Sequence, residues 1–180
     1  MLIIIVGFSQ QSNAQNQSSG LYLTLNDYQN HKLSYTGSPI SIHEFLGGSY
    51  VTVISNGQKL QLEKSKIFGY HDNANNDYRF FNNKAYQIVD TPEFCIYSYE
   101  KLTPQAGGKG PKPTMVYYFS KKNDSEILPL TTEDIAAAFP DNPKFRNMVE
   151  IESRVNMNLY AYDKQSHEYK IKELYAESLK

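Results

Sequence analysis

The feature that most constrains the fold is a series of short strand-like runs between residues 50 and 99, joined by turn residues. The runs are rich in β-branched and aromatic residues, which suit a pleated, half-buried surface better than a helix. Asn56-Gly57 separates the first two runs and favours a type I′ hairpin turn, because both residues tolerate positive φ angles. Short links favour pairing between consecutive strands, so the stretch predicts an antiparallel meander. The runs are 51–54, 59–62, 67–70, 78–81, 85–89 and 94–99.

The spacing of apolar residues changes from two to nearly four after residue 130. Thr131 can cap one helix, and Asn142-Pro143 begins a second, with proline pre-set for a first helical turn. A last helix is expected from about Glu168. The sequence therefore predicts an α+β fold, in which an antiparallel meander, strongly curved or partly closed into a barrel, precedes a helical segment packed on it. Residues 21–130 form the β-rich part and 131–180 the helical part of one expected domain.

The N-terminal residues resemble the second half of a secretory signal peptide. Residues 2–8 are a compact apolar run, and Ser12-Asn13-Ala14 offers a small-residue cleavage site, although a positively charged n-region is missing. A buried first strand is the alternative for this run. We expect a signal peptide over residues 1–14, a flexible leader over 15–20, and export to a periplasm or outside the cell. No stretch reaches the roughly 20 apolar residues that a membrane helix needs.

Charge and cysteine content exclude some functions. The net charge is −1 with scattered lysines and arginines, whereas nucleic-acid binding needs a concentrated basic face. Cys95 is the one cysteine, and its place in a predicted strand favours a small buried hydrophobe over a catalytic thiol. The tyrosine-rich composition is typical of strand packing, with a ligand platform as the alternative.

The most suggestive polar cluster is His71, Asp72, Asp77 and Arg79, which flank one expected hairpin. These four are weak candidates for a ligand-binding site. Asp72, Asn75 and Asp77 could offer oxygens to calcium, but the segment lacks the EF-hand pattern, and Asn and Asp are common in ordinary turns. A surface ion pair is the favoured interpretation of the charged residues. No metal, cofactor or catalytic residue is predicted.

Residues 101–113 form the longest segment expected to be irregular, and Gly107, Gly108, Lys109 and Gly110 make its flexible centre. A phosphate-binding loop of this kind would have to open a helix after a strand. Prolines follow the glycines here, and the next run is itself a strand, so a P-loop is rejected. A long hairpin loop is expected, and loops of this length sometimes bind partners.

Several short motifs made mostly of strand and cap residues are spread along the chain. They lie in residues 19–24, 69–70, 78–80, 96–98, 117–120, 130–131 and 138–142. These motifs resemble those of a group of small exported proteins from Bacteroidetes-type bacteria. The group has no established activity, so the resemblance implies export and a β-rich fold with a helical tail, and it supplies no catalytic residue.

These observations favour a non-catalytic binding or structural module at the bacterial cell envelope, with an unknown protein or glycan partner. The alternative is an envelope hydrolase or glycan-active enzyme with an unrecognised site around His71, Asp72, Asp77 and Arg79. A deep pocket with converging polar groups would favour the enzyme.

Overall fold

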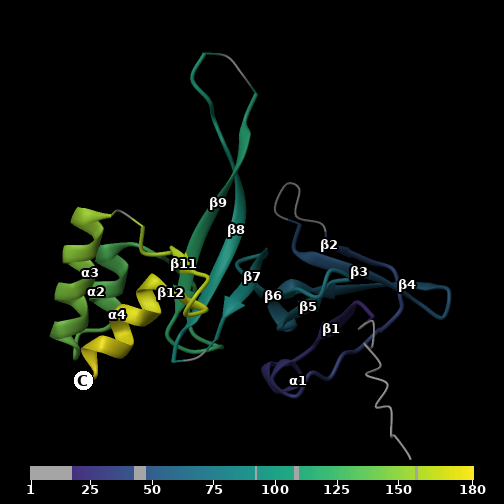
Figure 1. Ribbon diagram of the computed structural model, residues 1–180. Helices are drawn as coiled ribbons and strands as arrows, with labels where there is room; N and C mark the ends of the chain where they lie inside the picture. The colour runs from purple at the N-terminus through teal and green to yellow at the C-terminus, as the bar shows by residue number, and fades with distance from the viewer. Residues whose placement is uncertain (1–17, 43–47, 92, 108–109, 157) are drawn as a thin grey trace, which may run out of the picture.

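The computed structural model describes residues 18–42, 48–91, 93–107, 110–156 and 158–180 (Figure 1). Its main element is an antiparallel sheet of seven strands that curls strongly into a half-barrel, so the expected α+β class is confirmed. The expected signal peptide, residues 1–14, lies outside the described residues. In sheet order the strands are β1 (Gly20–Tyr22), β5 (Gly69–His71), β6 (Asp77–Phe81), β7 (Lys84–Asp90), β8 (Cys95–Thr103), β9 (Lys112–Ser120) and β10 (Leu128–Pro129).

A smaller sheet contains β2 (Ile40–Ile42), β3 (Tyr50–Ser55) and β4 (Gln58–Glu63). The β3–β4 turn has φ angles of 51° at Asn56 and 74° at Gly57, as a type I′ turn requires. β4 does not continue into the larger sheet as the meander predicts. A 3₁₀ turn, η2 (Lys64–Lys66), follows it, and β5 instead pairs with β1 and β6.

Two assignments near strand ends also differ from the expected ones. Gly20, expected in the flexible leader, is the first residue of β1 and pairs with His71. β8 and β9 continue their pairing as far as Thr103 and Lys112, so both ends of the segment expected to be irregular are strand. In Figure 1 these two strands rise well beyond the rest of the sheet.

The helices begin where the sequence predicts. Thr131 caps α2 by accepting a hydrogen bond from the Asp134 amide at 3.1 Å, and Asn142 caps α3 through the Phe145 amide at 2.9 Å. A short hairpin separates α3 from the last helix. The elements are α1 (Leu25–Gln29), α2 (Thr132–Ala138), α3 (Pro143–Val155), β11 (Tyr162–Asp163), β12 (Glu168–Tyr169) and α4 (Lys170–Ser178).

One face of the large sheet is covered by two different units (Figure 1). At the β1–β5–β6 end the smaller sheet packs on it, burying Leu21, Val51 and Val53. At the β8–β9 end α2, α3 and α4 pack on it, and buried Ile96 and Phe119 contact the helices. Burial of these apolar side chains is the main stabilising contribution on this face.

The opposite face of the large sheet is rich in tyrosine, and we call it the tyrosine face. Strand alternation places on it side chains from six neighbouring strands. Its closed part lies beneath α1 and the β9–β10 connection, because Tyr28 packs on Tyr22, and Ile127 packs with Tyr86, Cys95 and Tyr97. The face comprises Tyr22, His71, Asp77, Arg79, Tyr86, Cys95, Tyr97, Tyr118 and Ser120.

Candidate functional site

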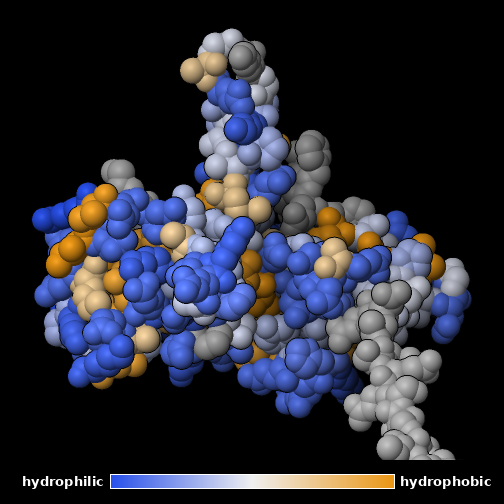
Figure 2. Space-filling model, viewed as in Figure 1, coloured by the Kyte–Doolittle hydropathy of each residue, from blue (hydrophilic) through white to orange (hydrophobic). Residues whose placement is uncertain are grey.

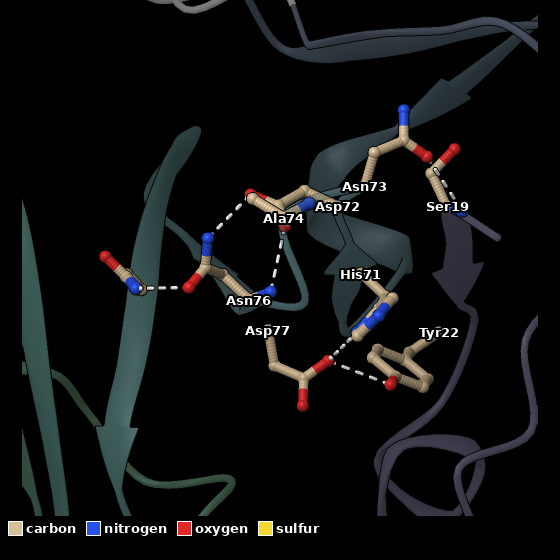
Figure 3. Close-up of polar contacts among 9 residues, drawn as sticks. Ser19, Tyr22, His71, Asp72, Asn73, Ala74, Asn76 and Asp77 are labelled. Carbon is tan, nitrogen blue, oxygen red and sulfur yellow. Dashed lines mark hydrogen bonds and ion pairs between the residues drawn. The ribbon is translucent and has the colours of Figure 1, made fainter. Parts of the chain in front are cut away.

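His71 and Asp77, two of the four expected site residues, meet on the tyrosine face. They are paired across the β5–β6 hairpin, with 2.8 Å between His71 Nδ1 and Asp77 Oδ1. The same carboxylate oxygen accepts a hydrogen bond from the Tyr22 hydroxyl at 2.9 Å (Figure 3). An ionised Asp77 accepts from both neighbours, which places the imidazole proton on Nδ1. The register of the β5–β6 hairpin brings His71 and Asp77 together, and β1 supplies Tyr22.

The imidazole is enclosed. His71 is only 3% exposed, and its Nε2 is buried with no hydrogen-bond partner in the described part of the chain. An Asp–His pair with a free Nε2 is the arrangement of a general base, but a base must reach the proton that it abstracts. Burial of this nitrogen therefore separates it from any substrate in this conformation.

Asp72, the third candidate, has a local structural role. Its carboxylate accepts hydrogen bonds from the Ala74 amide at 2.9 Å and the Asn76 amide at 2.8 Å, and from Asn76 Nδ2 at 3.0 Å (Figure 3). Burial acts to raise the pKa of Asp72, but these hydrogen bonds outweigh it and lower the pKa. Asp72 thus shapes the β5–β6 turn, as the turn interpretation predicts.

Arg79, the fourth candidate, is buried rather than at the surface, so the expected surface ion pair is wrong. It is 5% exposed, and no described carboxylate lies within 4.0 Å of it. Nη1 donates to the Tyr97 hydroxyl at 3.1 Å, and Nη2 donates to the Ser125 carbonyl at 2.7 Å. Strand alternation turns this side chain inward, where neutral oxygens satisfy the guanidinium.

The phenols and the thiol of the tyrosine face are held protonated. Burial raises the pKa of Tyr97 to about 12 and that of Tyr86 to about 12. Burial likewise raises the pKa of the Cys95 thiol, which donates to Asn123 Oδ1 at 2.6 Å. The predicted burial of Cys95 is thus confirmed. A nucleophilic cysteine needs a lowered pKa and access to solvent, and Cys95 has neither.

An open cavity of about 490 Å³ lies between β2 and β5, on the side of the hairpin away from the tyrosine face. Its lining includes the apolar residues Ile40 and Ile42, the aromatic Tyr70, and the polar residues Ser19, Ser38 and Asn73. His71 and Asp72 complete the β5 end of the lining. No lysine or arginine is among its described lining residues.

A ring stack and a hydrogen bond hold the cavity wall in place. Tyr70 stacks on Tyr78, with ring centroids 4.4 Å apart and planes 3° from parallel. Asn73 Oδ1 accepts a hydrogen bond from the Ser19 backbone amide at 3.3 Å. In Figure 3 the side-chain nitrogen of Asn73 points away from Ser19. The cavity wall thus brings an aromatic side chain and two isoleucines next to hydroxyl, amide and carboxylate groups.

The glycine segment lies far from this cavity in the sequence and is only partly described. Gly107 has a φ of 85° and is exposed, as is Gly110, whereas Gly108 and Lys109 lie outside the described residues. Among the described residues, no group of three or more His, Cys, Asp or Glu side chains could hold a metal ion.

Sequence reasoning missed Tyr22, Tyr97 and Ser120, which are the hydrogen-bonding partners of Asp77 and Arg79. They are 18 to 55 residues away along the chain, so no local spacing connects them. It also missed the cavity, because two separate sheets form its walls. The one available signal was the period of two that places His71, Asp77 and Arg79 on one face of a hairpin.

Comparison with protein-family models, curated proteins and solved structures finds no match. In the part of the chain that the structure describes, no helix is long and apolar enough to cross a membrane. The fold and the cavity therefore define the chain as an α+β protein with a curled antiparallel sheet and an open cavity at one end of it, lined without lysine or arginine among the described residues.

Proposed function

We propose that this chain is an exported, non-catalytic binding module of a bacterial cell envelope that takes a saccharide in the cavity between β2 and β5. The observation that carries the proposal is the composition of the cavity wall. The cavity volume of about 490 Å³ falls within the range of roughly 300–1,000 Å³ that small-molecule sites occupy.

A saccharide fits this wall better than an anion or a fully apolar ligand. Sugar rings present C–H groups on their faces and hydroxyl groups at their edges. The ring of Tyr70, held by its stack on Tyr78, offers an apolar surface, while Ser19, Ser38 and Asn73 carry hydroxyl and amide groups. A site for phosphate or carboxylate would require a cationic side chain, since charge-assisted hydrogen bonds bind such groups.

The state of the charged residues supports binding over catalysis. Asp72 is committed to its own turn, Arg79 donates to neutral oxygens, and the Asp77–His71 pair is closed by Tyr22. Of these four residues, His71 and Asp72 line the cavity, but Nε2 of His71 is buried and the Asp72 carboxylate accepts hydrogen bonds from its own turn. Catalysis needs a functional atom within hydrogen-bond reach of the substrate.

Export is supported by the apolar run at residues 2–8, the small-residue motif at 12–14 and the resemblance to exported proteins. The test is fractionation of bacteria that produce the chain with its N-terminal residues in place. We expect the processed protein in the periplasm or the medium, and retention of unprocessed protein in the cytosol would contradict this part of the proposal.

Binding is tested by isothermal titration calorimetry with a panel of neutral di- to tetrasaccharides, including N-acetylated ones. We expect at least one to bind and Ser38→Trp to weaken it at least tenfold, because the indole would occupy the cavity. Thr36→Trp is the matched control, since Thr36 is exposed on the same loop and does not line the cavity. Equal loss in both variants, or no binding by any saccharide, would contradict the site.

One observation favours a second candidate function, an envelope hydrolase. The His71–Asp77 pair, whose Nε2 has no hydrogen-bond partner among the described residues, has the composition of a general base, and local opening of the protein around this buried nitrogen would expose it. An enzyme of this kind would lose a measured hydrolytic activity in His71→Ala and Asp77→Asn. If those variants retained that activity, the His71–Asp77 site would be excluded.

A further inference from the structure

The outer part of the β8–β9 hairpin extends away from the body of the molecule. β8 and β9 pair without interruption out to Thr103 and Lys112, and Figure 2 shows this end as a narrow projection. Its outer four pairs join residues 100–103 to residues 112–115, and we call them the arm. Nearly every residue of the arm is exposed, so neither of its faces is packed on the described protein.

The strand register sorts the side chains of the arm by chemistry. Leu102 lies opposite Pro113 and Glu100 opposite Met115, so these four share one face. Leu102 is 61% exposed and Met115 is 47% exposed. The other face carries Lys101, Thr103, Lys112 and Thr114. The arm is therefore amphipathic. Its apolar face has three apolar residues, with Glu100 at the inner end, and the opposite, cationic face has two lysines and two threonines.

The charge of the arm is opposite in sign to that of the whole chain. Lys101 and Lys112 outweigh Glu100, so the arm has a net charge of +1, whereas the chain has a net charge of −1. Residues 101–123 contain five lysines and neither aspartate nor glutamate, although the lysines at 121 and 122 follow the opposite end of β9. Lys101 and Lys112 bring part of that charge to the polar face of the arm.

We infer that the arm docks on an anionic lipid surface. An amphipathic element lies in a membrane interface with its apolar face buried about 5–10 Å into the headgroup boundary. Leu102 and Met115 would enter that boundary, and the long, flexible side chains of Lys101 and Lys112 would remain at the level of the phosphates. Each lysine held near an anionic surface strengthens binding by a factor of about five.

Two other occupants use only half of this arrangement. A soluble polyanion would contact the lysines and leave the apolar face in water. A second copy of the chain would bury Leu102 and Met115 without requiring the lysines. A lipid surface uses both faces at once, and the inference does not depend on the saccharide cavity, which lies between β2 and β5.

Co-sedimentation of the full chain with vesicles tests the inference. The vesicles contain equal parts of phosphatidylcholine and phosphatidylglycerol, and pure phosphatidylcholine vesicles serve for comparison. The charge variant is Lys101→Glu with Lys112→Glu, and the apolar variant is Leu102→Ser with Met115→Ser. All four side chains are exposed, so both variants are expected to keep the fold.

Matched controls carry the same changes at exposed residues elsewhere. Lys59→Glu with Lys164→Glu controls for total charge, and Ile151→Ser with Val155→Ser controls for total apolar surface. We expect at least tenfold weaker binding to the anionic vesicles in both arm variants, from about fivefold per lysine in the charge variant, and no change in the controls.

Three outcomes would overturn the inference. Vesicle binding that both arm variants retain would place any lipid contact elsewhere. Heparin binding lost in the charge variant, with vesicle binding unaffected by the apolar variant, would identify a polyanion site. A concentration-dependent dimer that the apolar variant abolishes, without vesicle binding, would identify a second copy as the occupant.

Discussion

Arg79 Nη1 donates a hydrogen bond to the Tyr97 hydroxyl over 3.1 Å, inside a face that excludes solvent from both residues. The Tyr97 hydroxyl is in turn 2.9 Å from Ser120 Oγ, and Ser120 Oγ donates to the Lys122 carbonyl at 2.7 Å. The buried cation is thus stabilised by neutral oxygens and by the rings of Phe81 and Tyr97, at 5.7 and 5.9 Å. Removing a partner from such a network costs more than an isolated hydrogen bond contributes.

Replacing Tyr97 with phenylalanine tests this network. The change leaves Arg79 Nη1 with Ser120 Oγ at 3.5 Å as its remaining partner on that side. We expect the free energy of unfolding to fall by about 1–3 kcal/mol, the cost of leaving a buried donor poorly satisfied. Urea unfolding monitored by circular dichroism measures the change.

A double-mutant cycle isolates the pair. In an Arg79→Met background the guanidinium is gone, so Tyr97→Phe should cost clearly less than it does in the natural sequence. Tyr50→Phe, at a tyrosine that is 43% exposed, is the control and should leave stability unchanged. Equal costs in both backgrounds would show that the hydrogen bond to Arg79 contributes nothing.

Gly69 is required because β6 passes very close to it. A Cβ atom at this position would lie 1.7 Å from the Tyr78 carbonyl oxygen, which belongs to the backbone and cannot turn away. Gly69→Ala should therefore lower the free energy of unfolding by about 1–3 kcal/mol or more, as overpacking does. Urea unfolding measures the loss, and Gly110→Ala, where no described atom would lie within 4 Å of the added Cβ, should be neutral in the same measurement.

Stability should fall at alkaline pH because of the buried phenols. Tyr86 has its pKa raised from 10.0 to about 12 by burial, so between these values the unfolded chain has lost a proton that the folded chain retains. The folded state then binds more protons, and the free energy of unfolding decreases as pH rises, by about 1.4 kcal/mol per pH unit for each such tyrosine. Below pH 10 this contribution is constant.

Tyr86→Phe should make that alkaline decrease less steep, by the amount for one tyrosine. Denaturant unfolding at several pH values between 9 and about 12 measures the slope. Tyr50→Phe, which removes a phenol that is 43% exposed, is the matched control. If the two variants have the same pH dependence, Tyr86 is not held protonated by the fold.

The first helix of the C-terminal part depends on its cap. Thr131 Oγ1 accepts from the Asp134 amide at 3.1 Å and donates to the Asp134 carboxylate at 2.8 Å. Thr131→Ala should cost about 1 kcal/mol of stability, as loss of an N-cap does. Thr132→Ala lies one residue inside the helix and should not destabilise it; an equal loss there would argue against the cap.

Local features of this fold were predictable from the sequence. Asn56-Gly57, Thr131 and Asn142 determine a turn and two helix starts through their own backbone and side-chain chemistry, and all three are confirmed. The strand runs of the large sheet after residue 67 were also predictable, because each pairs with the next along the chain.

Contacts between distant segments were not predictable. β4 could have paired with β5, but β1, about 50 residues earlier, takes that edge. The same pairing brings Tyr22 to Asp77, which no spacing in the sequence signals. The burial of Arg79 depends on the curl of the sheet and on the β9–β10 connection that covers it, so charge pattern alone wrongly favoured a surface ion pair.

The measurement that tests the account most directly is an amide chemical-shift titration of the ¹⁵N-labelled chain with the best-binding saccharide of the panel. The account predicts perturbations confined to the cavity wall, around residues 38–42 and 70–73, with the sugar recovered intact. Perturbations centred on Tyr22, Asp77 and Arg79, together with cleavage of the sugar, would contradict it and would assign the chain as an enzyme acting through the tyrosine face.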